Sequence, residues 1–243
     1  MTESPKPIRV PLELLKQHED FGKKQLLQLS NSPDWVVRHV TAKEMLARLE
    51  DADAAEDLGM PTDPRELCDV AKKEFDTLRD RHGMALAPFS MFVMNKGGGR
   101  TKHGKPAIFV AVKKIEGLSF ESSEDLIEEG HAPALLDLYR TLYGYLDGKF
   151  IEAQENPDSK FLWDIMGVYQ YILAEKDGRE EFVLVDLDPL VGSTRAMLAT
   201  TVRTVTEELA VMIEVYREKG ESFRGIAKEF QALSERIASA GIF

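Results

Sequence analysis

The stretch VYQYILAEKDGREEFVLVDLDP, residues 168–189, contains the clearest fold signal in the sequence. Apolar and polar side chains alternate in its first half, Asp177 and Gly178 follow, and residues 182–185 form a second apolar run. Two such runs joined by an Asp-Gly pair are typical of a β-hairpin. The second run ends at Asp186-Leu187-Asp188, so two carboxylates are expected where a buried strand emerges. This position suits a metal ion, although a plain strand-ending turn has the same pattern.

The composition excludes several classes of protein. The 243 residues include 31 Lys and Arg against 42 Asp and Glu, which gives a net charge of -11. This charge repels phosphate backbones and anionic lipids, so neither nucleic acid nor a membrane surface is expected as a main partner. Cys68 is the only cysteine, and no two of the five histidines are four residues apart, so neither a disulfide framework nor a zinc site is expected.

The sequence shows no secretory signal pattern, and no apolar run approaches the length of about 18 residues that a membrane-spanning helix needs. We therefore expect a cytoplasmic protein.

The first part of the chain predicts strands arranged around a helix. Residues 25–40 read as a hairpin that places Arg38 inside an apolar strand, and residues 41–44 have the spacing of a capping box that opens a helix. Thr62-Asp63-Pro64 predicts the start of another helix, whose apolar stripe includes Glu74. Because a buried carboxylate and a buried arginine each need a partner, we predict an ion pair between Arg38 and Glu74. The alternative is that Glu74 lies at the edge of the stripe and reaches water.

Two apolar runs, residues 87–95 and 107–117, predict a second strand pair joined by a loop. Three consecutive glycines, residues 97–99, raise the possibility of a phosphate-binding loop. The Walker pattern is absent, however, and no helix is predicted directly after these glycines. We therefore interpret the loop as a mobile connection between two strands.

The rest of the chain is mainly helical by its apolar spacing. Residues 133–146 predict a core-facing helix, and residues 147–159 an irregular loop. Two long helices are predicted near the C-terminus, over residues 198–216 and 223–237. Because the predicted hairpin at residues 168–185 brings its two ends together, Asp164 before it and Asp186 after it are expected at one edge of a sheet.

This order of elements resembles the protein-kinase-like fold, particularly its aminoglycoside-phosphotransferase-like branch. The sequence EFDTL from Glu74 is similar to the helix motif that carries the family's glutamate, and Arg38 stands where the family has a strand lysine. Residues 109–120, FVAVKKIEGLSF, resemble the fifth strand and the hinge. Asp164 in WDI resembles the catalytic-loop aspartate, and Asp186 resembles an Mg²⁺-binding aspartate.

The resemblance implies an α+β, two-lobed architecture. Residues 1–116 would form a small antiparallel-sheet lobe with the inward-facing helix, and residues 117–243 a mainly helical lobe with a β-hairpin. ATP and Mg²⁺ would be the cofactors, and the acceptor a small molecule or a protein. The implied site residues are Asp164 for catalysis, Arg38, Glu74, Lys113, Lys114 and Ile115 for the cofactor, and Asp186, Gln170 and Asp188 for the metal.

The sequence departs from the family pattern at several positions. Tyr169 stands where a metal-binding asparagine is expected, with Gln170 next to it, and Leu187-Asp188-Pro189 replaces the usual Phe-Gly. Arginine is also no simple substitute for lysine, because its planar fork differs from a compact ammonium.

Alternative interpretations concern both the alignment and the function. Residues 110–113, VAVK, match the lysine strand superficially, but too few residues then separate Lys113 from Asp186 for the remaining elements. The chain would be an ATP- and Mg²⁺-dependent phosphotransferase or a nucleotide-binding pseudokinase. The alternative is a non-catalytic α+β interaction or regulatory protein that uses its C-terminal helices and in which Asp186 and Asp188 merely end a strand.

Overall fold

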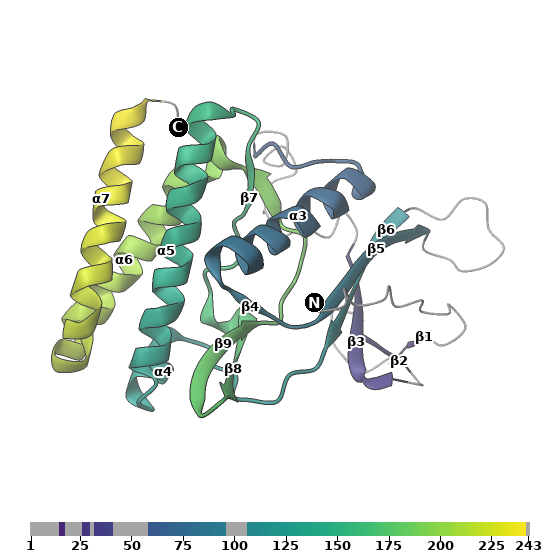
Figure 1. Cartoon of the computed structure of the whole chain (residues 1–243), viewed down its shortest axis with the longest axis horizontal. Helices are drawn as coiled ribbons and strands as arrows, with labels where there is room; N and C mark the ends of the chain where they lie inside the picture. Colours follow the sequence, from purple (N-terminus) through teal and green to yellow (C-terminus); the bar gives the residue numbers. More distant parts are fainter. Residues whose placement is uncertain (1–14, 18–25, 30–31, 41–57, 96–105, 242–243) are drawn as a thin grey trace.

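The protein has an α+β fold in which one antiparallel sheet and a group of long helices lie at opposite ends. The computed structural model describes residues 15–17, 26–29, 32–40, 58–95 and 106–241. Figure 1 shows α5, α6 and α7 side by side on the left, the sheet on the right, and α3 between them. One continuous apolar core runs from α3 and the sheet to α7.

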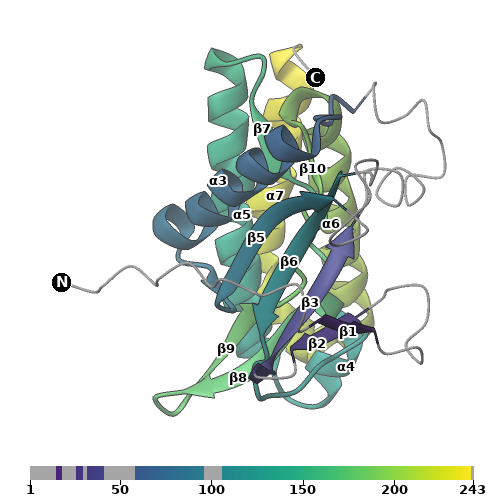
Figure 2. The ribbon, with the colours of Figure 1, turned by 90° about the vertical axis from the view of Figure 1, so that its right-hand side faces the viewer.

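The sheet has five strands in the order β1-β2-β3-β6-β5, and all neighbouring strands are antiparallel. Its strands are β1 (Leu15–Gln17), β2 (Leu26–Leu29), β3 (Ser32–Val40), β5 (Phe89–Asn95) and β6 (Pro106–Lys113). Both predicted strand pairs are therefore confirmed, and Figure 2 shows this sheet face on. Because side chains alternate along a strand, Val37 of β3 packs with Phe109 on one face, while Val36 and Arg38 point to the other.

Helix α3 (Pro64–His82) begins where the sequence predicts. The side chain of Asp63 caps it by accepting hydrogen bonds from the backbone amides of Arg65, at 2.8 Å, and Glu66, at 3.0 Å. One face of the helix contacts β5 and β6, and another contacts α5. Glu74 is buried, so its predicted inward position is confirmed.

The predicted hairpin is present as β8 (Tyr171–Lys176) and β9 (Arg179–Leu184), paired antiparallel. Asp177 and Gly178 at its turn both have positive φ, 53° and 73°, as a two-residue type I′ turn requires. The first strand starts later than expected, because η2 (Val168–Gln170) is a 3₁₀ turn. Strand β4 (Ala85–Leu86) lies parallel to β9, and β7 (Lys160–Leu162) pairs with β10 (Val191–Ser193).

The remaining elements are α4 (Ser123–Glu128), α5 (Ala132–Glu155), α6 (Thr194–Gly220), η3 (Glu221–Phe223) and α7 (Arg224–Ala240). Both predicted C-terminal helices are confirmed. The predicted loop at residues 147–159 is wrong, because α5 continues to Glu155. Its buried stripe extends through Lys149, Phe150 and Ala153, which prolongs the helix past Gly148. None of the helices that the structure describes is both long and apolar enough to cross a membrane.

Two sequence predictions fall outside the described residues. They are the helix that opens at residues 41–44 and the glycine loop at residues 96–105.

Candidate functional site

Arg38, Asp186 and Asp188 form an ionic cluster, here called the cavity cluster, where the end of β9 meets the sheet. Arg38 Nη2 lies 2.6 Å from Asp186 Oδ1 and 3.2 Å from Asp188 Oδ1. The exposed fractions of the side chains are 13% for Arg38, 21% for Asp186 and 4% for Asp188. Burial lowers the pKa of Arg38, but the two carboxylates together outweigh it and raise this pKa above its ordinary value. The guanidinium therefore stays charged beside the two carboxylates.

A cavity of about 260 Å³ borders the cavity cluster. Its walls come from β3, β6, the segment after β6 and the β8–β9 hairpin, and consist of Val36, Arg38, Val112, Lys113, Lys114, Ile115, Ile172 and Val185. Four of these, Arg38, Lys113, Lys114 and Ile115, are residues that the family resemblance assigns to the cofactor. Since Val185 directly precedes Asp186, the apolar wall of the cavity leads to the carboxylates.

Gln170 connects the two aspartates that the sequence predicts to meet. Its backbone oxygen accepts hydrogen bonds from the amides of Val185, at 3.0 Å, and Asp186, at 3.1 Å. Its side-chain Nε2 donates to Asp164 Oδ1 at 2.9 Å. The same residue thus contacts both aspartates, and the structure brings them to the same end of the hairpin. The other side-chain atom, Oε1, is buried and accepts no hydrogen bond among the described residues.

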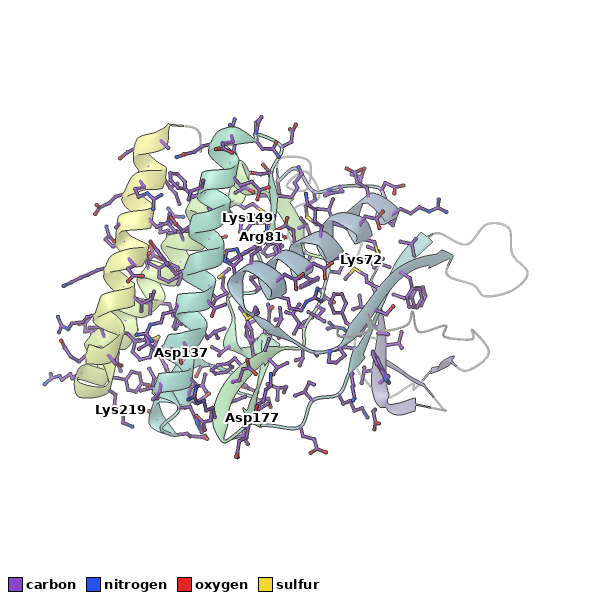
Figure 3. All side chains as sticks on the ribbon, in the orientation of Figure 1. Lys72, Arg81, Asp137, Lys149, Asp177 and Lys219 are labelled. Atoms are coloured by element: carbon purple, nitrogen blue, oxygen red, sulfur yellow. The ribbon has the colours of Figure 1, made fainter. Side chains whose placement is uncertain are left out.

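Glu74 lies apart from the cavity in a second buried group, here called the helix cluster, which also contains Lys149, Tyr145 and Glu152. Lys149 Nζ lies 2.7 Å from Glu74 Oε2 and 2.8 Å from Glu152 Oε2. Figure 3 labels Lys149, which projects from α5 on the side of α3. The predicted ion pair between Arg38 and Glu74 is therefore wrong. The Glu74 carboxylate on α3 faces α5 and pairs with Lys149. The Arg38 guanidinium pairs instead with Asp186 and Asp188, which follow β9.

Hydrogen bonds complete the helix cluster. Tyr145 donates from its hydroxyl to Glu74 Oε2 at 3.0 Å, and the same hydroxyl accepts from the backbone amide of Leu162 at 2.8 Å. Burial raises the pKa of Glu74, and the ammonium of Lys149 and the tyrosine hydroxyl only partly offset this rise. These contacts tie α3 to both α5 and β7.

The end of β6 and the segment that follows it form the rim of the cavity. Two of its amides are used within the protein, since Lys113 donates to the carbonyl of Pro88 at 2.8 Å and Lys114 to that of Asp34 at 2.7 Å. A planar ligand at this rim would therefore be bound by carbonyl groups or by the backbone that follows Lys114.

The same segment is fastened to β8 just beyond the rim. Leu118 and Leu173 exchange two backbone hydrogen bonds, of 3.0 and 2.8 Å. A Cβ atom on Gly117 would lie 2.3 Å from the carbonyl oxygen of Leu173 and 2.6 Å from Ile172 Cγ2. The close approach of these two segments thus requires a residue without a side chain.

A larger hollow of about 540 Å³ lies between α5 and the turn of the β8–β9 hairpin. Asp137 of α5 and Asp177 of the turn contribute to its lining, and both are labelled in Figure 3. None of the predicted site residues lines this hollow. We therefore place the candidate site at the smaller cavity, which adjoins a cluster of buried charges.

Several residues of these two regions were not predicted from the sequence. Val36, Ile172 and Val185 line the cavity, and each continues the apolar alternation of its strand, which is the signal that could have found them. Lys149 lies four residues after the buried Tyr145, on the stripe of α5, so its helical spacing marked it as an inward-facing cation.

Comparisons with known proteins do not assign the chain to a family. No protein-family model matches the sequence, and no curated protein matches it. Within the described ranges, no group of three or more His, Cys, Asp or Glu residues is placed to hold a metal ion.

Proposed function

We propose that this chain is a kinase-like protein that binds ATP with Mg²⁺ at the cavity beside Arg38. The observation that carries the proposal is the composition of this cavity. Residues 148 positions apart, Arg38 and Asp186, hydrogen-bond to each other next to a hollow that Lys113, Lys114 and Ile115 also line. Phosphotransferases need this combination of an apolar base site, a cation and acidic metal ligands.

The chemistry of the lining suits a nucleotide. The walls are mostly branched aliphatic residues, whose side chains pack well on the faces of a flat base, and the charged residues of the lining are Arg38, Lys113 and Lys114. In this arrangement Arg38 would steady the phosphates, since a guanidinium pairs well with phosphate oxygens. Glu74 would not take part, because it belongs to the helix cluster.

The donor set at the cavity cluster also suits Mg²⁺. This ion prefers oxygen ligands and is commonly held by one or two carboxylates together with nucleotide phosphates. Asp186 and Asp188 would provide the carboxylates, and the buried Oε1 of Gln170, which accepts no hydrogen bond among the described residues, would add an amide oxygen. When bound, the ion would neutralise phosphate charge.

Asp164 would orient the acceptor hydroxyl if the protein transfers a phosphoryl group. The hydrogen bond from Gln170 holds its carboxylate in position at the end of the hairpin. The proposed architecture is then two-lobed, with residues 1–116 as the sheet lobe and residues 117–243 as the mainly helical lobe. The acceptor would be a small molecule or a protein.

Calorimetric titration of ATP with Mg²⁺ tests the proposal. We expect the wild-type chain to bind and Asp186→Asn to bind at least about tenfold more weakly, a loss of about 1.4 kcal/mol, because a metal ligand is lost. Asp164→Asn should bind like the wild type and lack any phosphoryl transfer. Asp137→Asn is the matched control, because it removes a carboxylate at the larger hollow and should leave binding unchanged.

Wild-type protein that binds no nucleotide at millimolar ATP would refute the proposal. The non-catalytic interaction protein would then be the better interpretation. Weakened binding in Asp137→Asn alone would move the site to the larger hollow.

A further inference from the structure

The larger hollow, between α5 and the turn of the β8–β9 hairpin, has the size of a ligand site. Its volume of about 540 Å³ falls within the range of about 300–1,000 Å³ that small-molecule sites occupy. Three of the residues that line it, Met84, Leu138 and Phe182, belong to the apolar core and are only 3%, 4% and 6% exposed. The floor of this hollow is therefore apolar, and it is built from three separate segments of the chain.

Charged residues border this floor, and most of them are acidic. The acidic residues of the lining are Asp137, Asp177, Glu180 and Glu181, and the basic ones are Lys176 and Arg179. Asp137 belongs to α5 and Asp177 to the hairpin turn, so carboxylates border the hollow on two elements, and both residues are labelled in Figure 3. An apolar floor with a mainly acidic border suits a ligand that joins a positive charge to an apolar group.

Asp137 and Asp177 can both pair with such a ligand. Asp177 is exposed, and it takes part in none of the ion pairs among the described residues. Asp137 pairs with Arg140 at 2.8 Å, but the side chains of Asp137 and Arg140 are 75% and 62% exposed. Because an exposed ion pair stabilises a protein only weakly, a ligand cation can replace Arg140 at little cost.

Glu180 and Glu181 contribute charge to the border but already have partners. Glu180 pairs with His131 at 2.8 Å, and Glu181 lies 3.6 Å from the ammonium of Lys176. The described lining as a whole has four carboxylates against two basic groups, and the chain has a net charge of -11. A cation is therefore attracted to this hollow, whereas an anion is repelled.

We propose that the larger hollow binds a small organic cation, in which an amine or a guanidinium is joined to an apolar group. The positive group pairs with Asp137 and Asp177, and the apolar group packs on the floor that Met84, Leu138 and Phe182 form. This site is separate from the cavity beside Arg38, so its test does not depend on nucleotide binding.

The first test uses three probes that share one apolar group and differ in charge. Phenylbutylamine is cationic at neutral pH, phenylbutanol is neutral and phenylbutyrate is anionic. Each is titrated at low salt into the full chain with methyl-labelled methionine, and the nuclear magnetic resonance signal of Met84, assigned with Met84→Leu, reports binding at the floor. We expect phenylbutylamine to bind at least about tenfold more tightly than phenylbutyrate, with phenylbutanol between them, because only the charged end differs.

The second test removes the carboxylates one at a time. Asp137→Asn and Asp177→Asn should each weaken the binding of phenylbutylamine about threefold and leave that of phenylbutanol unchanged. Asparagine adopts positive φ readily, so Asp177→Asn preserves the turn, where φ is 53°. The matched control is Asp147→Asn, which removes a carboxylate that lies on the same helix but pairs with Arg236 and does not line the hollow. This control should bind phenylbutylamine like the wild type.

Several results would overturn the proposal. They are equal affinities for the three probes, tightest binding of phenylbutyrate, and a Met84 signal that no probe shifts at millimolar concentration. An unchanged affinity for phenylbutylamine in both carboxylate variants, or an equal loss in Asp147→Asn, would do the same. Circular dichroism checks the folding of each variant, and if one does not fold, the comparison of the three probes on the wild type decides.

Discussion

Both ionic clusters pair one cation with two carboxylates among the described residues, but they differ in what lies beside them. In the helix cluster, the Glu74 carboxylate pairs with the Lys149 ammonium at 2.7 Å and accepts a hydrogen bond from the Tyr145 hydroxyl at 3.0 Å. The same hydroxyl accepts a hydrogen bond from a backbone amide. In the cavity cluster, one guanidinium serves two carboxylates at the wall of a hollow. The helix cluster therefore joins elements of the fold, whereas the cavity cluster lies beside a hollow.

The largest expected change in stability comes from removing the cation of the helix cluster. Lys149→Met leaves the Glu74 carboxylate buried without its cation, which should lower the free energy of unfolding by about 3–5 kcal/mol. Urea denaturation measures this change. The control is Arg140→Gln on the same helix, whose pair with Asp137 is mostly exposed and should contribute about 1 kcal/mol or less. A similarly small loss for Lys149→Met would mean that water reaches the helix cluster in solution.

Removing a hydrogen bond from the same cluster should have a smaller effect. Tyr145→Phe deprives Glu74 of a donor and the Leu162 amide of its acceptor, so we expect a loss of about 1–3 kcal/mol in the free energy of unfolding. Tyr143→Phe is the matched control, because the Tyr143 ring packs against Phe230 of α7, with ring centres 5.4 Å apart. Equal losses in the two variants would contradict a specific role for the Tyr145 hydroxyl.

The cavity cluster should tolerate the loss of one carboxylate. Asp188→Asn leaves Arg38 paired one to one with Asp186, so the free energy of unfolding should change by about 1 kcal/mol or less. Thermal unfolding monitored by circular dichroism gives this value. A loss as large as that of Lys149→Met would show that the Asp188 carboxylate is needed for folding, and the contrast between the two clusters would disappear.

The smallest expected effect is a pH dependence next to the helix cluster. Burial, and then the positive charges of Lys149 and Arg81, lower the pKa of His82. The folded chain therefore binds fewer protons here than the unfolded chain, and stability is lost as the pH falls from about 6.5, the unfolded pKa, toward the lower pKa of the folded chain. His82→Gln should lose less stability than the wild type between about pH 7.5 and 5.5.

The His82 titration can also be followed directly by nuclear magnetic resonance. A midpoint at or above that of an unfolded histidine would contradict the expected direction. The accompanying stability difference between the wild type and His82→Gln would then be absent or reversed.

Local signals predicted much of the fold. The start of α3 was predictable because Asp63 and Pro64 each have a physical role at a helix N-terminus, and the β8–β9 turn because Asp177-Gly178 suits two positive φ angles. The inward position of Glu74 followed from helical spacing alone.

The partners of buried charges were not predictable in the same way. Whether Glu74 pairs with Arg38 or with Lys149 depends on how α3 is oriented over the sheet and against α5. No local sequence pattern predicts that orientation. Gly148 also interrupts the apolar spacing of α5, so the segment that carries Lys149 was predicted as a loop. This glycine instead accommodates the imidazole of His82, which lies 3.3 Å from where a Cβ atom on Gly148 would be.

The glycine at position 117 has a consequence for what the cavity can admit. Because Gly117 lets the rim segment lie against the carbonyl of Leu173, the spacing between rim and hairpin is set by main-chain hydrogen bonds. The separation of the two cavity walls that contain Ile115 and Ile172 is thus governed by the backbone next to them. Substitutions among the aliphatic wall residues would change the side chains that line the cavity, whereas any side chain at position 117 would force the two segments apart.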